Sequence, residues 1–134
     1  MYALSSYDYA LIRLIPNVER GECLNVGVLL FCRTRSFLGM RVSLDAARIQ
    51  ALAPGVDIDE VRQQLDAMLR ICAGSSEAGS LGSMSQSERF HWLTSPRSTI
   101  LQPSPVHSGL CSDPELTLES LFKKMVSWPV SSNS

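Results

Sequence analysis

Two polar segments, far apart in the chain, carry side chains that could bind or transform a ligand. The first, PNVERGECLN, places Glu19, Glu22 and Asn25 at the entrance of a long apolar run. Two carboxylates in different surroundings can divide the roles of general acid and general base. The same residues could equally form a solvent-exposed turn with local Glu–Arg pairing. Both interpretations stay open at the level of sequence.

The second segment, RFHWLTSPRSTILQPSPVHSG, is the stronger candidate for a site. Arg97 follows a proline in a turn rich in hydroxyl groups, and a guanidinium beside such donors can hold phosphate or carboxylate. The alternative is a structural Arg97 that bonds carbonyl groups of its own loop. From both segments we assign ligand or partner binding to Glu22, Asn25, Arg97, Ser98, Gln102 and His107.

The familiar spacings of catalytic and metal sites do not occur in this sequence. His91 and His107 could act as an acid–base pair or as metal ligands, but no H-x-x-x-H and no clustered cysteines accompany them. The patterns G-x-S-x-G, G-x-x-x-x-G-K-[ST] and G-x-G-x-x-G are also missing. We therefore assign no catalytic residue, expect no metal and no cofactor, and favour a protein that is not an enzyme.

Composition restricts the class of partner and the compartment. The chain has 134 residues, 45% of them hydrophobic, and a net charge of -1. This length suits a single domain (1–134) that needs no disulfide to fold. The near-neutral charge argues against nucleic acid as a partner, although Arg33, Arg35 and Arg41 beside Phe37 keep a nucleic-acid-binding module as a second alternative.

The localisation that we expect is cytoplasmic. No apolar run reaches the roughly 20 residues of a membrane span, and the first residues lack the features of a secretory signal. The four cysteines form no C-x-x-C pair and fit reduced thiols in an apolar core.

Hydrophobic patterns predict three strands in the first third of the chain, over 7–15, 23–33 and 37–44. In the second, apolar residues occupy both faces, which is typical of a central strand. We expect Val26, Val28 and Leu30 on one face of it and Leu29 and Phe31 on the other. Gly27 inside this run indicates a bulge or the close approach of another group.

Helices are predicted over 44–55, over 58–72 and after Asp113. The stripe in 58–72 follows helical spacing, with Asp57 as N-cap and Gly74 as the terminating glycine. Asp113 and Pro114 suit the start of the last helix, whose apolar face has Leu118 and Leu121. The Ser- and Gly-rich segment 74–88 is predicted to be a flexible loop, RFHWL (89–93) a strand, 98–106 an extended segment, and 127–134 a frayed tail.

Together these elements predict an α+β fold. We expect an antiparallel sheet of about five strands with two or three helices mainly on one face. Such a fold would form one recognition face only if the segments around Glu22 and Arg97 meet over the same side of the sheet. The sequence gives no oligomeric state and no identity for a ligand.

The segments ALIRLIPNVERGECLNVGVLLF and FHWLTSPRSTILQPSPVHSGL, in this order and before a terminal helix, resemble the bacterial domain-of-unknown-function family 3037. The likeness extends from about Tyr7 to Val126. It implies a small bacterial cytosolic protein and no particular activity. The characteristic positions of the family correspond here to Glu22, Asn25, Gly27, Pro96, Arg97, Ser98 and His107.

The resemblance also implies a partner. Genes of this family often lie beside one for a kinase-fold protein similar to the toxin component of HipA-type toxin–antitoxin systems. We therefore expect a non-enzymatic protein-interaction or accessory module, with an antitoxin-like role towards such a HipA-like protein. The alternative is a small nucleotide- or anion-binding enzyme that uses Glu22, Asn25, Arg97, Ser98 and His107.

Overall fold

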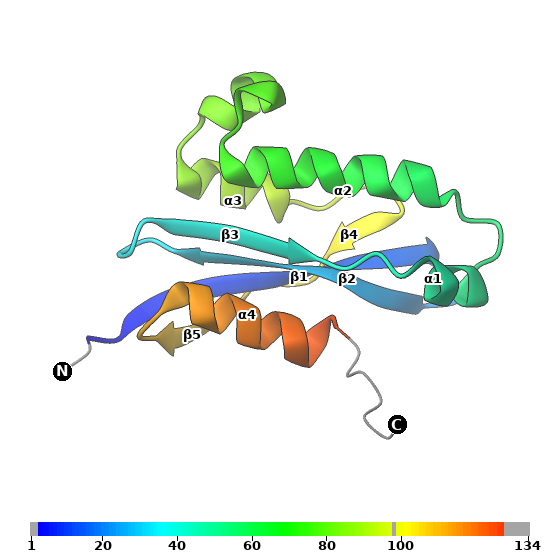
Figure 1. The fold of residues 1–134 in the computed structure, drawn as a ribbon, viewed down its shortest axis with the longest axis horizontal. Helices are drawn as coiled ribbons and strands as arrows, with labels where there is room; N and C mark the ends of the chain where they lie inside the picture. Colours follow the sequence, from blue (N-terminus) through cyan, green and yellow to red (C-terminus); the bar gives the residue numbers. More distant parts are fainter. Residues whose placement is uncertain (1–2, 98, 128–134) are drawn as a thin grey trace.

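The computed structural model describes residues 3–97 and 99–127 and contains an antiparallel sheet with helices on both faces (Figure 1). Five strands form the sheet: β1 (Ser5–Asn17), β2 (Glu22–Cys32), β3 (Phe37–Val42), β4 (Leu101–Pro103) and β5 (His107–Cys111). The strand order is β3-β2-β1-β4, and β5 also pairs with β1. The predicted fold class and the antiparallel meander of the first three strands are confirmed.

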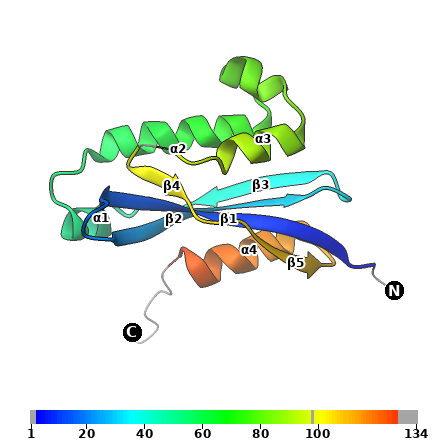
Figure 2. The ribbon, with the colours of Figure 1, turned by 180° about the vertical axis from the view of Figure 1, so that it is seen from behind.

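The long strand β1 shares its outer edge between two short strands, as Figure 2 shows from behind. Its first part pairs with β5 and its second part, Ile12–Leu14, pairs with β4. Ser104 joins the two pairings, because its buried hydroxyl accepts the Leu11 N–H at 2.8 Å while its own N–H reaches the Leu11 carbonyl at 2.8 Å. The Ser104 hydroxyl thus takes the place of a strand carbonyl. The neighbouring Pro103 and Pro105 have no N–H to donate.

The central strand β2 contains the irregularity that Gly27 predicts. Gly27 pairs with Ile12, but the next pair joins Asn25 to Arg13, so Val26 is the extra residue of a bulge. The bulge moves Val26 to the same face as Leu29. The prediction of Val26 together with Val28 and Leu30 is therefore wrong, because simple alternation cannot anticipate an inserted residue.

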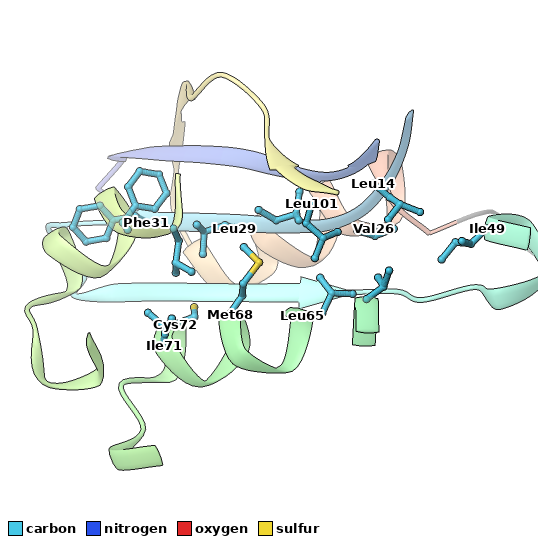
Figure 3. Close-up of a cluster of buried hydrophobic side chains, with 14 residues drawn as sticks. Leu14, Val26, Leu29, Phe31, Ile49, Leu65, Met68, Ile71, Cys72 and Leu101 are labelled. Carbon is cyan, nitrogen blue, oxygen red and sulfur yellow. The ribbon is translucent and has the colours of Figure 1, made fainter. Parts of the chain in front are cut away.

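One face of the sheet is covered by the helices of the middle third of the chain. These are α1 (Ala46–Leu52), α2 (Ile58–Ala73), the 3-10 helix η1 (Ser76–Ser83) and α3 (Gln86–Leu93). Asp57 caps α2 and Gly74 ends it in the left-handed conformation, as predicted. Leu65, Met68 and Ile71 of α2 pack onto the sheet, as Figure 3 shows.

The helix α4 (Pro114–Met125) covers the opposite face, below the sheet in Figure 1. Asp113 accepts hydrogen bonds from the N–H groups of Glu115 and Leu116, which fixes the predicted start of this helix. Leu118 and Leu121 pack against a second apolar cluster that includes Val28 and Leu30 of β2. The structure therefore has more helices than predicted, and one of them lies apart from the rest.

The segment 74–93 differs most from the prediction. In place of a loop over 74–88 followed by a strand, it holds η1 and α3. A capping box between Ser85 and Glu88 starts α3, and Phe90 and Leu93 are buried one turn apart. A short apolar run such as RFHWL is ambiguous by periodicity alone, and the cap decides it. The missing strand is supplied instead by β5.

In the described parts of the chain, no helix has the length and apolar character needed to cross a membrane. The predicted tail over 127–134 lies outside the described residues from 128 onwards.

Candidate functional site

Arg97 closes the C-terminal end of α3. Its Nη2 donates to the carbonyls of Trp92 at 3.1 Å and Leu93 at 3.3 Å. Its Cζ lies 4.5 Å from the centre of the Trp92 ring, within the range of a cation–π contact. The last carbonyls of a helix have no partner inside the helix, and a cation there also opposes the negative end of the helix dipole. The guanidinium therefore has a structural role that the sequence left as an alternative.

The surroundings of Arg97 are partly apolar. A cavity of about 340 Å³ beside it is lined by α2, by Trp92 and by Leu101 of β4. Burial lowers the pKa of Arg97, and its Nε is buried with no hydrogen-bond partner within the described chain. An anionic ligand in this cavity would have to compete with the helix carbonyls for the same guanidinium.

Gln102 links the Arg97 turn to the sheet. Its Oε1 accepts the Arg97 N–H at 3.4 Å, and its Nε2 donates to the Thr99 carbonyl at 2.5 Å. In β4, Gln102 pairs with Arg13 of β1. Ser98, which the sequence groups with Arg97, lies outside the described residues.

Asn25 binds the other layer of the molecule. Its Nδ2 donates to the carbonyl of Met125 at 3.0 Å, in the last turn of α4. A groove of about 410 Å³ runs beside it, between the start of β2 and the end of α4, and Cys23, Arg48 and Lys124 contribute to its walls. Asn25 therefore anchors α4 to the sheet next to a basic groove.

Glu22 and His107 lie at the starts of two different strands, β2 and β5. Glu22 forms an exposed bidentate ion pair with Arg20, at 2.7 Å and 3.2 Å, and this pair holds the pKa of the carboxyl below its usual range. This arrangement matches the open turn with local Glu–Arg pairing. His107 begins β5, opposite Tyr9, and the two ring centres are 5.4 Å apart.

The five predicted site residues that the structure describes do not form one cluster. Arg97 and Asn25 bond to helices on opposite faces of the sheet, α3 above and α4 below in Figure 1. Among the predicted residues that the structure describes, Arg97 and Gln102 are joined by a hydrogen bond. Arg97 and Asn25 therefore do not contribute to one shared recognition face.

The arginines of the alternative nucleic-acid patch are each engaged by a different neighbour. Arg33 donates to Ser87 at 3.3 Å, Arg35 donates to Ser5 at 3.2 Å, and Arg41 pairs with Glu119 at 3.5 Å. Over residues 3–97 and 99–127, no group of three or more His, Cys, Asp or Glu side chains could hold a metal ion.

Sequence reasoning missed several contacts that shape these places. Trp92 was assigned to a strand, so its stacking under Arg97 could not be foreseen. Arg48 and Lys124 reach the Asn25 groove from distant helices, and no local pattern signals this. A further cleft of about 630 Å³ between the end of β1 and the start of α2 has Asp57 and Glu60 in its wall.

Comparison with protein families gives one match. The family described as "Protein of unknown function (DUF3037)" matches residues 9–126, which is most of the chain. Neither the curated proteins nor the solved structures give a match.

Proposed function

The chain belongs to the DUF3037 family of proteins of unknown function, and from this premise we propose that it is a non-enzymatic interaction module for another protein. The observation that carries the proposal is a surface on β5, β1 and the residue before β1 that exposes two leucines among polar side chains. We call it the β5 surface and define it by Leu4, Ser6, Asp8, Ser108 and Leu110.

The pairing of β1 with β5 places these side chains together. Ser6 pairs with Leu110 and Asp8 pairs with Ser108, and paired residues of antiparallel strands share a face. Their neighbours in sequence, such as Tyr7 and Cys111, pack on the opposite side in the cluster with α4. The β5 surface therefore faces away from α4.

The β5 surface exposes apolar side chains that would be better buried. Leu4 is 64% exposed and Leu110 is 66% exposed. Leu4 directly precedes β1 and lies two residues before Ser6, the partner of Leu110. The Ser108 hydroxyl donates to Asp8 at 2.6 Å and supplies a polar border. Apolar side chains grouped beside polar ones are typical of protein–protein contacts.

The partner that we propose is a kinase-fold protein similar to the toxin component of HipA-type systems. This part of the proposal is supported by the family resemblance and its gene neighbourhood, and the β5 surface supplies a place for the contact. An accessory or antitoxin-like role follows if the complex lowers the activity of that kinase-fold protein.

Co-purification of the two proteins, followed by titration calorimetry, tests the proposal. We expect the unaltered chain to bind at micromolar concentration and Leu110→Asp to weaken binding by at least about tenfold, since a charge would be buried in an apolar contact. Leu116→Asp is a matched control, because Leu116 of α4 is also 66% exposed but lies away from the β5 surface.

Failure of the unaltered chain to bind the kinase-fold protein would refute the proposed partner. Equal affinities of the unaltered chain and Leu110→Asp would refute the proposed surface. Both variants alter exposed positions, so their thermal midpoints should match that of the unaltered chain.

A further inference from the structure

Strand β3 is a sheet edge with an unused row of backbone groups. The N–H of Ser43 donates to the carbonyl of Val26 at 2.8 Å, so the pair Val26–Ser43 is hydrogen-bonded. The register of β2 and β3 continues from it without a shift through Phe37. Because bonded and non-bonded pairs alternate, the backbone groups of Leu38, Met40 and Val42 point away from β2. The described sheet has no strand on that side.

This edge lacks the devices that usually prevent strands from pairing. Exposed edges are commonly protected by proline, a bulge, lysine or very short strands. The opposite edge of the sheet shows such protection, since it is divided between β4 and β5 and interrupted by Pro103 and Pro105. In β3 there is no proline, lysine or bulge, and its one charge, Arg41, is paired with Glu119 of α4.

We propose that β3 pairs antiparallel with β3 of a second copy of this chain, with the two-fold axis at Met40, so that the two sheets become continuous. In this register Leu38 is opposite Val42 of the second copy, and Met40 is opposite its own equivalent. Every outward N–H and C=O of these three residues gains a partner, because each such pair exchanges two hydrogen bonds.

The side chains of β3 select this register. On the α4 face, Arg41 comes to lie opposite Gly39 of the second copy, which has no side chain to oppose it. The Phe37 ring covers Gly39 so closely that a Cβ at Gly39 would lie 2.7 Å from its Cζ. Arg41 of one copy therefore meets an aromatic ring of the other, a favourable contact for a guanidinium.

The neighbouring registers are worse. A shift of two residues in one direction places Arg41 opposite Arg41 of the second copy, and like charges directly opposite are destabilising. A shift in the other direction leaves Val42 opposite Ser36, which lies in the turn with a positive φ of 51°. On the face of α2, the preferred register brings together only Leu38, Met40 and Val42, which already border the apolar core.

This contact is independent of the β5 surface, since β3 and β5 lie at opposite edges of the sheet. We propose a second copy as the partner, because each residue of β3 that would take part in the contact is opposite a compatible residue of β3 in the second copy. A strand from a different protein is the competing outcome, and the experiment below separates the two.

Sedimentation velocity of three proteins tests the proposal: the unaltered chain, Met40→Pro and Met40→Ala. We expect a dimer for the unaltered chain at a concentration on the order of 0.1 mM. In Met40→Pro, the pair of residue 40 with its equivalent in the second copy loses both N–H donors. The hydrogen bonds between β3 and β2 stay intact, because the Met40 N–H points away from β2. Gly39 tolerates a following proline, so this variant should be a folded monomer. Met40→Ala keeps the N–H and should dimerise.

A second measurement covers the case in which Met40→Pro fails to fold. In a Cys23→Ser background, Met40→Cys places two thiols across the axis on backbones about 5.5 Å apart, within the range of a disulfide. Mild oxidation should give a covalent dimer, whereas Leu110→Cys in the same background should give none.

A monomeric unaltered chain at this concentration overturns the proposal. The proposal is also overturned if Met40→Pro folds and still dimerises. It is likewise overturned if the unaltered chain dimerises but oxidation of Met40→Cys gives no covalent dimer. If the unaltered chain is a monomer and Met40→Pro loses binding to a different protein, the edge accepts a foreign strand and the self-pairing is refuted. Leu110→Asp should leave the dimer unchanged, so failure here is distinct from failure of the proposed partner.

Discussion

Arg97 lies over the ring of Trp92, with its Cζ 4.5 Å from the ring centre, and donates to the carbonyl of the same residue at 3.1 Å. One side chain thereby closes α3, shields an exposed tryptophan and fixes the direction in which the chain leaves towards β4. This contact assigns Arg97 a structural role.

Arg97→Ala should lower the free energy of unfolding by about 1–3 kcal/mol, since it removes charged hydrogen bonds and the ring contact. Urea denaturation measures this loss. Arg97→Lys keeps the charge but lacks the planar guanidinium. Its urea midpoint should therefore lie between those of the unaltered chain and Arg97→Ala. If Arg97→Ala were as stable as the unaltered chain and lost a thermal shift produced by inorganic phosphate, Arg97 would instead be a ligand-binding residue.

Asn25 ties β2 to the end of α4 through the Met125 carbonyl. Asn25→Ala should destabilise the protein by about 1 kcal/mol, the contribution of one such hydrogen bond. Asn25→Asp should cost more, because an ionised carboxylate cannot donate and would face the negative end of a helix. Hydrogen exchange of the α4 amides should increase in this order, and equal protection in all three proteins would contradict the anchoring role.

Ser104 is buried, 3% exposed, and its hydroxyl is the acceptor for the Leu11 N–H. Ser104→Ala would leave that N–H without a partner and should cost about 1–3 kcal/mol in thermal unfolding. Ser108→Ala is the control, because its exposed hydroxyl donates to the Asp8 side chain, and we expect a loss of at most about 0.5 kcal/mol. Equal losses of unfolding free energy in Ser104→Ala and Ser108→Ala would contradict the role of Ser104 as a buried acceptor.

The cysteines should differ strongly in reactivity. Cys23 is exposed, whereas Cys32, Cys72 and Cys111 are buried, and all four are free thiols. Burial raises the pKa of Cys72 to about 12, so the reactive thiolate is scarce at neutral pH. Iodoacetamide should modify Cys23 within the folded protein and the others only in denaturant, as mass spectrometry can follow. Rapid modification of Cys72 in the native state would contradict the packing of α2 on the sheet.

Local signals in the sequence were enough for much of the fold. Alternating and continuous apolar runs predicted β1, β2 and β3, and the stripe in 58–72 predicted α2 with both of its ends. Asp113 and Pro114 marked the start of α4. These elements are specified by residues that are close in sequence, and Gly27 even marked the bulge in β2.

The tertiary structure decided mainly the contacts between segments that are far apart in the sequence. The run RFHWL became helical through a cap at Ser85, and β5 formed because β1 offered it a free edge. Asn25 bonds to Met125, 100 residues away in the chain, and Arg97 bonds to the preceding helix α3, so these two predicted site residues lie on opposite faces of the sheet. Periodicity records how residues alternate along one element, but the layer on which an element packs depends on the burial of all of them together, and only the folded chain determines that.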